Sequence, residues 1–257
     1  MLISTRKAIL ALIRQKSATL CHRCPARLSP HRDPGRAREA GNGRKPPGFP
    51  MGAAGLMEMT GDMGDMPPHW LVYVGADDVN AATERLESLG GAVHRAPADI
   101  HGVGRFAVVA DPHGAVFCLL TPVMPEGPRP EEPPMGAGGS FAWHELYAGN
   151  AEEALDFYGK LFGWTPDEVM DMGTMGSYRM YAHGGNQHGG MMTRMPDMPV
   201  PFWNAYIAVD ALDAAAERLH AGGGQMVNGP MEVPGGGWAL NAIDPQGAFF
   251  SLFSMVP

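Results

Sequence analysis

The segment FAWHELYAG, residues 141–149, carries one carboxyl group between two large aromatic side chains. Alternate residues of a strand face the same side, so Trp143, Glu145 and Tyr147 would share one face while His144 points the other way. Apolar surroundings would raise the pKa of the carboxyl and suit Glu145 to act as a general base. The alternative is a structural role, in which Glu145 is an interior carboxylate hydrogen-bonded to Tyr147 or Tyr206.

Other residues capable of chemistry are isolated or badly spaced. Cys21-x-x-Cys24 has histidines nearby, but their spacing does not fit a zinc site. His183 and His188 flank Gly-Gly pairs and are expected at the tip of a hairpin, in a surface loop. Cys118 has no histidine placed to activate it, so we expect a small buried residue and not a nucleophile.

Charge and composition exclude several classes of partner. The net charge is −8, and 11 of the 19 Lys and Arg residues lie in residues 1–48, which leaves an acidic remainder. An acidic body without a basic stripe is not expected to bind nucleic acid. No uninterrupted apolar run approaches the roughly 18 residues of a membrane span, so no membrane partner is expected. Three cysteines suit a reducing compartment, and we expect a cytoplasmic protein.

The elements that must position these residues are revealed by an internal repeat. PHWLVYVGADDVNAATERLESLGG, from Pro68, matches PFWNAYIAVDALDAAAERLHAGGG, from Pro201, and DPHGAVFCLL, from Asp111, matches DPQGAFFSLF, from Asp244. Both pairs keep the same offset, so the register holds without a gap. The chain therefore contains a duplicated structural unit.

Each copy is predicted to be a β-α-β-β-β unit. Short β-branched and aromatic runs begin the copies, and helices over residues 79–89 and 212–221 follow, each ended by a Gly-Gly pair. The last two strands form a hairpin at Asp-Pro-x-Gly, where Asp111 and Asp244 are expected to shape the turn.

A third unit, residues 139–198, lies between the copies. Its first strand leads into a helix that Asn150 is predicted to cap together with Glu153, and that Gly163 ends. Two further strands are expected after this helix. We therefore divide the chain into a divergent N-terminal segment (1–50), an incomplete first module (51–125), a Pro/Glu-rich linker (126–138) and a complete second module (139–257).

The segments WHELYAGNAEEALDFYGKLFGW, FWNAYIAVDALDAAAERLHAGGG and DPQGAFFSLF together resemble the vicinal oxygen chelate superfamily, which includes glyoxalase I, bleomycin-resistance proteins and extradiol dioxygenases. The resemblance covers about residues 52–257 and implies an α+β fold. In this fold, repeated βαβββ units form cup-shaped mixed sheets, two units to a module, around a small ligand. The activity is not implied, because the superfamily spans lyases, dioxygenases, epimerases and drug-binding proteins.

The first module departs from the family pattern. It lacks the W-x-E-L…FY…FGW segment, and only MGAAGLMEM, residues 51–59, resembles the closing strand of that unit. We interpret residues 1–50 as a divergent or misread replacement, for example through a frameshift or a wrong start, and expect this segment to be largely disordered.

Metalloenzymes of the superfamily hold a divalent ion with His, Gln or Glu from the first and last strands of paired units. In this chain the resemblance maps those positions onto Trp143, Asn204 and Ser251, and in the first module onto Leu71 and Cys118. Tryptophan cannot bind a metal ion, and Asn and Ser are weak ligands for a transition metal. We therefore expect neither a metal nor another cofactor.

The sequence thus predicts a glyoxalase-like protein whose second module binds a small, partly aromatic or apolar molecule in a metal-free cup. The expected lining residues are Trp143, Glu145, Tyr147, Asn204, Tyr206 and Ser251. If the protein turns its ligand over, we expect a lyase or isomerase with Glu145 as the base. One alternative is a metal-dependent lyase or dioxygenase. The other is a non-catalytic interaction protein, in which the incomplete first module leaves a sheet edge that pairs chains into a homodimer.

Overall fold

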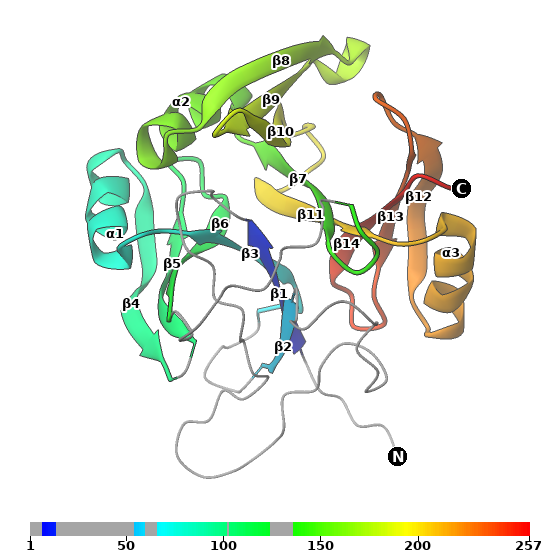
Figure 1. Cartoon of the computed structure of the whole chain (residues 1–257), viewed down its shortest axis with the longest axis horizontal. Helices are drawn as coiled ribbons and strands as arrows, with labels where there is room; N and C mark the ends of the chain where they lie inside the picture. The colour runs from blue at the N-terminus through cyan, green and yellow to red at the C-terminus, as the bar shows by residue number, and fades with distance from the viewer. Residues whose placement is uncertain (1–6, 14–53, 60–65, 102, 124–135) are drawn as a thin grey trace.

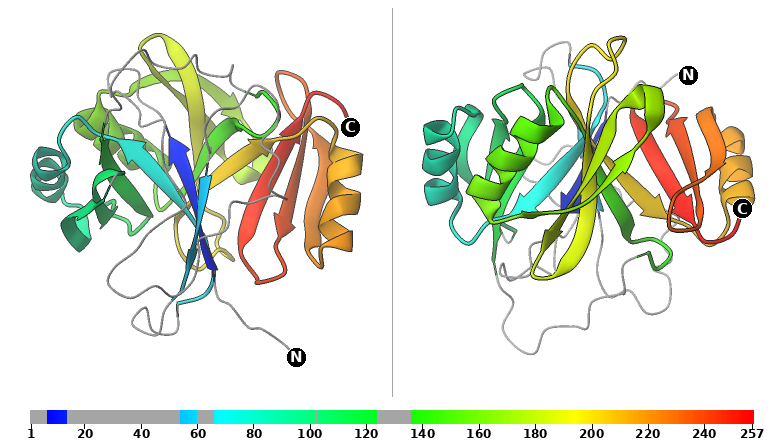
Figure 2. Two further views of the ribbon diagram at one scale, coloured as in Figure 1. Left: turned by 60° about the horizontal axis from the view of Figure 1, so that its bottom comes forward. Right: turned by 90° about the horizontal axis from the view of Figure 1, so that it is seen from above.

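The computed structural model describes residues 7–13, 54–59, 66–101, 103–123 and 136–257, with the backbone alone for 7–13 and 54–58. The chain forms an α+β fold with two mixed sheets (Figures 1 and 2). The strand order is β2-β1-β3-β6-β5-β4 in the first sheet and β12-β13-β14-β11-β7-β10-β9-β8 in the second.

The first sheet and its helix consist of β1 (Lys7–Ile13), β2 (Ala54–Glu58), β3 (Trp70–Gly75), α1 (Val79–Ser88), β4 (Ala92–Ile100), β5 (Gly104–Ala110) and β6 (Val116–Pro122). The second sheet and its helices consist of β7 (Phe141–Ala148), α2 (Ala151–Phe162), β8 (Thr165–Asp171), β9 (Ser177–His183), β10 (Asn186–Thr193), β11 (Phe202–Ala208), α3 (Leu212–Ala221), β12 (Gln225–Glu232), β13 (Trp238–Ile243) and β14 (Phe249–Ser254), with a short 3-10 turn at Gly173–Met175.

The predicted repeat is confirmed by two matching units, β3-α1-β4-β5-β6 and β11-α3-β12-β13-β14. The helices α1 and α3 end before Gly90 and Gly223, whose φ angles of 90° and 83° few other residues adopt. Asp111 and Asp244 accept hydrogen bonds from backbone N–H groups of their own turns, as expected.

The second sheet is curved, and α2 and α3 lie on its outer side (Figure 1). At its centre β7 pairs antiparallel with β11, which in turn pairs parallel with β14. The register places Glu145 opposite Asn204, Trp143 opposite Tyr206, and Tyr206 opposite Ser251. The two strand pairs therefore bring five of the six predicted site residues together before any side-chain contact is considered.

The third unit contains one strand more than the sequence predicted. After α2 the chain forms β8, β9 and β10, and β8 lies at the edge of the sheet. Its sequence, TPDEVMD, has a proline at the second position, which suits an edge strand. Its residues are mostly exposed and lack the apolar alternation that identifies an inner strand. The hairpin tip predicted near His183 and His188 is confirmed, because Gly184 and Gly185 form the turn between β9 and β10. Their expected placement in a surface loop was wrong: His183 is the last residue of β9 and His188 lies within β10.

The strand directions in the first sheet differ from those in the second. β1 takes the place beside β3 that β7 takes beside β11, but β1 runs parallel to β3 where β7 runs antiparallel to β11. β2 pairs antiparallel with β1 and is the strand expected from residues 51–59. The N-terminal segment 1–50 was expected to be largely disordered, but its residues 7–13 form β1. The other residues of this segment, and most of the predicted linker, lie outside the described residues.

One apolar cluster of the described residues spans both modules. The helix α2 packs against the second sheet, and its Phe157 and Tyr158 belong to the same cluster as Val72 of β3 and Phe117 of β6. The Tyr158 hydroxyl donates to Asp111 Oδ2 of the first module at 3.2 Å and accepts from Trp203 Nε1 at 3.0 Å. The modules are thus connected by both aromatic packing and a buried hydrogen-bonded chain.

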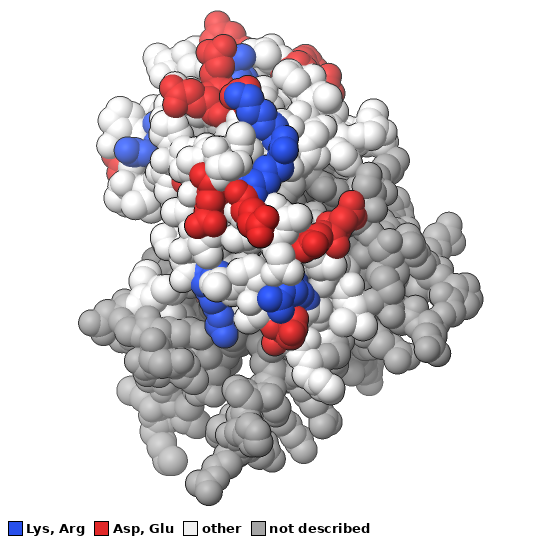
Figure 3. Space-filling view, turned by 90° about the vertical axis from the view of Figure 1, so that its left-hand side faces the viewer, with Lys and Arg blue, Asp and Glu red and all other residues white. Residues whose placement is uncertain are grey.

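On the side of the molecule that carries α1 and α2, basic and acidic side chains are interspersed (Figure 3). Within the described part of the chain, none of the helices has the length and apolar character needed to cross a membrane.

Candidate ligand-binding face of the second module

Trp143, Glu145 and Tyr147 alternate along β7 with residues that are packed under α2. Leu146 and Ala148 are fully buried in the core shared with that helix. The alternation of a strand therefore turns Trp143, Glu145 and Tyr147 toward the side opposite the helix. The residues of the second sheet on this side are named here the Glu145 face.

The opposite orientation predicted for His144 is confirmed. Its Nδ1 lies 3.4 Å from the backbone carbonyl oxygen of His188, and its ring packs 5.8 Å from that of Phe141. His144 is therefore part of the packing on the helix side and does not join the Glu145 face.

Glu145 is buried, with 7% of its surface exposed, among neutral hydrogen-bonding groups. The Tyr206 hydroxyl donates to Glu145 Oε2 at 2.9 Å. Burial raises the pKa of the Glu145 carboxyl, and hydrogen bonds from Tyr147, Tyr206, Tyr178 and Asn204 oppose that rise. The arrangement combines both sequence interpretations, since the carboxyl is hydrogen-bonded to tyrosines and also has a raised pKa.

Tyr178 completes this cluster, and the sequence reasoning missed it. It lies on β9, two strands from β7, yet Trp143 Nε1 donates to its hydroxyl oxygen at 2.7 Å. The ring crosses β10 at Gly190, where a Cβ atom would lie 2.2 Å from two of the Tyr178 ring carbons. Only glycine leaves room there, so Gly190 is the sequence signal that could have indicated the crossing.

Asn204 and Ser251 form a second polar group on the same face. Asn204 Nδ2 donates to Ser251 Oγ at 2.9 Å, and Ser251 Oγ donates to Asn241 Oδ1 at 2.7 Å. Asn204 and Ser251 are almost completely buried. Asn241 of β13 was not predicted, because its position opposite Ser251 follows only from the strand register.

Apolar side chains extend the Glu145 face around these polar groups. Met192 lies opposite Tyr147 in the strand register, and Met180 lies opposite Gly190. The Tyr147 ring stacks on Phe202 with 4.9 Å between centroids. Trp143, Tyr147 and Tyr206 remain half-buried, so the face keeps aromatic surface that a ligand can contact.

The donor set at the family's metal positions does not fit a divalent ion. Trp143 has no lone pair to offer, and its N–H is used in the hydrogen bond to Tyr178. The Asn204 amide and the Ser251 hydroxyl bind each other. Glu145, which lies beside these positions, is the one carboxylate donor on the described strands β7, β11 and β14. Across the ranges that the structure describes, no cluster of three or more His, Cys, Asp or Glu side chains could hold a metal ion.

The corresponding side of the first module is apolar. Tyr73, Phe106, Cys118 and Leu120 form one buried cluster there. Burial raises the pKa of the Cys118 thiol to about 12, so this residue is a buried apolar group, as expected, and not a nucleophile.

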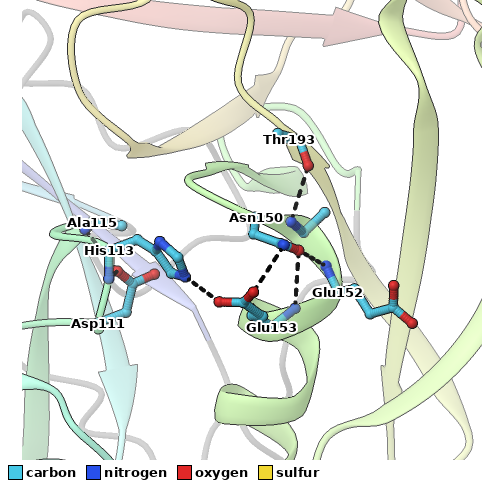
Figure 4. Close-up of polar contacts among 8 residues, drawn as sticks. Asp111, His113, Ala115, Asn150, Glu152, Glu153 and Thr193 are labelled. Carbon is cyan, nitrogen blue, oxygen red and sulfur yellow. Dashed lines mark hydrogen bonds and ion pairs between the residues drawn. The ribbon is translucent and has the colours of Figure 1, made fainter.

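A pocket of about 350 Å³ lies on the outer side of the molecule, where α1, α2 and the β5–β6 turn meet. Figure 4 shows that its polar groups serve the helix end: Asn150 accepts from the N–H groups of Glu152 and Glu153, and His113 Nε2 lies 2.8 Å from Glu153 Oε2. The predicted cap at Asn150 is therefore confirmed. We assign these residues to the junction between modules, because they lie on the helix side of the sheet.

Comparison with known proteins agrees with this architecture. The profile of the Glyoxalase/Bleomycin resistance protein/Dioxygenase superfamily matches residues 140–252, and that of a Glyoxalase-like domain matches residues 27–120. The chain is 34% identical to CFP32 of Mycobacterium tuberculosis, a protein provisionally named a glyoxylase, over 82% of this chain and 74% of that protein. It is 35% identical to the anthracycline biosynthesis protein DnrV of Streptomyces peucetius, over 76% of this chain and 68% of that protein.

Among solved structures, the Mn(II)-bound glyoxalase of Novosphingobium aromaticivorans superposes with a TM-score of 0.54. The alignment covers 98% of this chain and 82% of that protein at 15% identity, and at this level of identity it is a likeness of fold alone. The sequence relatives, the two profile matches and the repeated βαβββ units agree with one another. The chain belongs to the glyoxalase/bleomycin resistance protein/dioxygenase superfamily, the vicinal oxygen chelate proteins.

Proposed function

We propose that the second module binds a small, partly aromatic organic molecule on the Glu145 face without a metal ion. The observation that carries this proposal is the set of hydrogen bonds made by the residues at the family's metal positions. Trp143 bonds to Tyr178, and Asn204 bonds to Ser251, so these side chains form a hydrogen-bonded wall and not a converging set of metal ligands.

The chemistry of the face supports an organic ligand with an aromatic part. Half-buried aromatic rings and methionine side chains offer stacking and an adaptable apolar surface, while Glu145 and Asn204 give polar direction. The relative DnrV, which is named for anthracycline biosynthesis, is consistent with a role in small-molecule chemistry.

Native mass spectrometry of the untagged chain, freshly purified from its own host, tests the proposal. We expect a retained organic molecule that is lost in Trp143→Ala, and the same molecule, when it is added back, should quench tryptophan fluorescence more in the wild type than in Trp143→Ala. A matched control is Trp238→Ala, because Trp238 packs on the helix side of the sheet against α3. Retention that is unaffected by Trp143→Ala and lost in Trp238→Ala would contradict the assignment of the face.

A second candidate is acid/base turnover of the bound molecule, as in a lyase or isomerase. The raised pKa of Glu145 favours it, because a carboxyl with a raised pKa accepts a proton more readily than an ordinary glutamate does. Conversion of the retained molecule by the wild-type chain, abolished in Glu145→Gln with binding kept, would support catalysis. Equal conversion by both proteins would exclude Glu145 as the base.

A further inference from the structure

Glu145 is a buried acid that has no positively charged partner among the described residues. The contributions to its pKa come from burial and from neutral hydrogen-bond donors, and none comes from a Lys, Arg or His of the described chain. Its neighbours on the packed strands are likewise neutral: Tyr147 on β7, Tyr178 on β9, Asn204 and Tyr206 on β11. An ionised carboxylate in such a place is costly until a cation pairs with it.

Four aromatic residues surround this carboxyl. The Tyr206 hydroxyl donates to Glu145 Oε2 at 2.9 Å, Tyr147 and Tyr178 lie near enough to lower the pKa of the carboxyl, and Trp143 is joined to Tyr178 by a hydrogen bond. Aromatic faces attract cations, and a group of such rings around one acid is the arrangement that proteins use to recognise alkylated ammonium groups. The partial exposure of Trp143, Tyr147 and Tyr206 leaves their surfaces accessible to such a group.

We propose that the ligand of the Glu145 face carries an alkylated ammonium group, which sits against Glu145 between Trp143 and the tyrosines. This inference rests on the proposed function and deepens it by naming the charge of the ligand. The cation supplies the missing partner of the carboxylate, while the rings contact its alkyl groups. A ligand that presents a carboxylate or phosphate to the same place is disfavoured, because the described residues around Glu145 include no basic group to pair with it.

Binding of the cation is coupled to release of a proton. Without a cation, burial favours the neutral form of Glu145, and the bound ammonium group favours the ionised form. Affinity for the cation therefore rises with pH until Glu145 is ionised before binding, and it then becomes constant. A neutral ligand of the same shape shows no such dependence.

The test compares choline with 3,3-dimethylbutan-1-ol, its neutral isostere, by NMR titration of the full chain with methyl-labelled methionines. Met180 and Met192 lie on the Glu145 face and report occupancy there. We expect choline to bind about tenfold more tightly than the isostere, from a cation–π and ion-pair gain of about 1.4 kcal/mol. The preference should disappear in Glu145→Gln and persist in Glu168→Gln, a matched change at an exposed site.

Phenol serves as a third probe that separates this inference from the proposed function. Equal affinities for choline and its isostere, or binding of phenol alone, would overturn the cationic ligand and leave the ligand-binding face in place. If none of the three probes shifts the Met180 and Met192 signals, the proposed function itself is overturned. A choline preference that survives in Glu145→Gln would also contradict the inference, since the carboxyl would not be its source.

Discussion

Gly190→Ala tests whether the absence of a side chain at this position holds Tyr178 over the Glu145 carboxyl. An added Cβ would lie 2.2 Å from two Tyr178 ring carbons, whereas carbon atoms in contact are separated by about 3.5–4.0 Å. The ring must therefore move by more than about 1 Å. A shift of this size breaks the 2.7 Å bond from Trp143 Nε1 to the Tyr178 hydroxyl and moves that hydroxyl away from Glu145.

The magnitude follows from two contributions. Crowding a packed position costs about 1–3 kcal/mol, and loss of a hydrogen bond to a charged or buried group costs about 1–3 kcal/mol. We expect Gly190→Ala to lower the free energy of unfolding by about 2–6 kcal/mol in denaturant titrations. In this size range that corresponds to a fall in Tm of roughly 4–24 °C.

A double-mutant cycle with Tyr178→Phe separates these contributions. The phenylalanine ring is still displaced by the new methyl group, but it has no hydroxyl to lose. Gly190→Ala should therefore cost about 1–3 kcal/mol less in the Tyr178→Phe background than in the wild type. Strictly additive effects, or a neutral Gly190→Ala, would refute the proposed crossing of β10 by Tyr178.

Three further predictions concern buried groups. Tyr158→Phe should destabilise the chain by about 2–4 kcal/mol in denaturant titrations, because Trp203 Nε1 and Asp111 Oδ2 each lose a buried partner; a change below 0.5 kcal/mol would contradict this. In Glu145→Gln, stability relative to the wild type should rise as pH increases from the ordinary glutamate pKa of 4.5 toward the raised value, because the folded wild type resists ionisation; a pH-independent difference in unfolding midpoints would be inconsistent with the raised pKa. In a variant without the two N-terminal cysteines, Cys118 should react with a thiol reagent only on unfolding, since it is fully buried; rapid labelling of the folded chain would disprove that burial.

The parts of the structure that sequence predicted are those governed by local pattern. The alternation along β7 gave the shared face of Trp143, Glu145 and Tyr147, because the period of a strand is fixed by its backbone. The repeat likewise gave the helices α1 and α3 and the turns at Asp111 and Asp244, where local hydrogen bonds decide the conformation.

The parts that sequence missed depend on contacts between distant strands. Tyr178 reaches Trp143 across an intervening strand, and Asn241 meets Ser251 only through the register of β13 and β14. The parallel direction of β1 relative to β3 results from pairing between distant parts of the chain, which no local pattern specifies. The edge strand β8 was missed because its mostly exposed residues show no alternation.

The most direct test of the metal-free account is a calorimetric titration of the untagged chain with Zn²⁺, Ni²⁺ and Mn²⁺, alongside Glu145→Ala and Asn204→Ala. The account predicts that any metal uptake by the wild type is the same in both variants, because the Glu145 face supplies no set of converging ligands. A tight, stoichiometric site in the wild type that is lost in both variants would contradict it, and would show that Glu145 and Asn204 hold a metal ion.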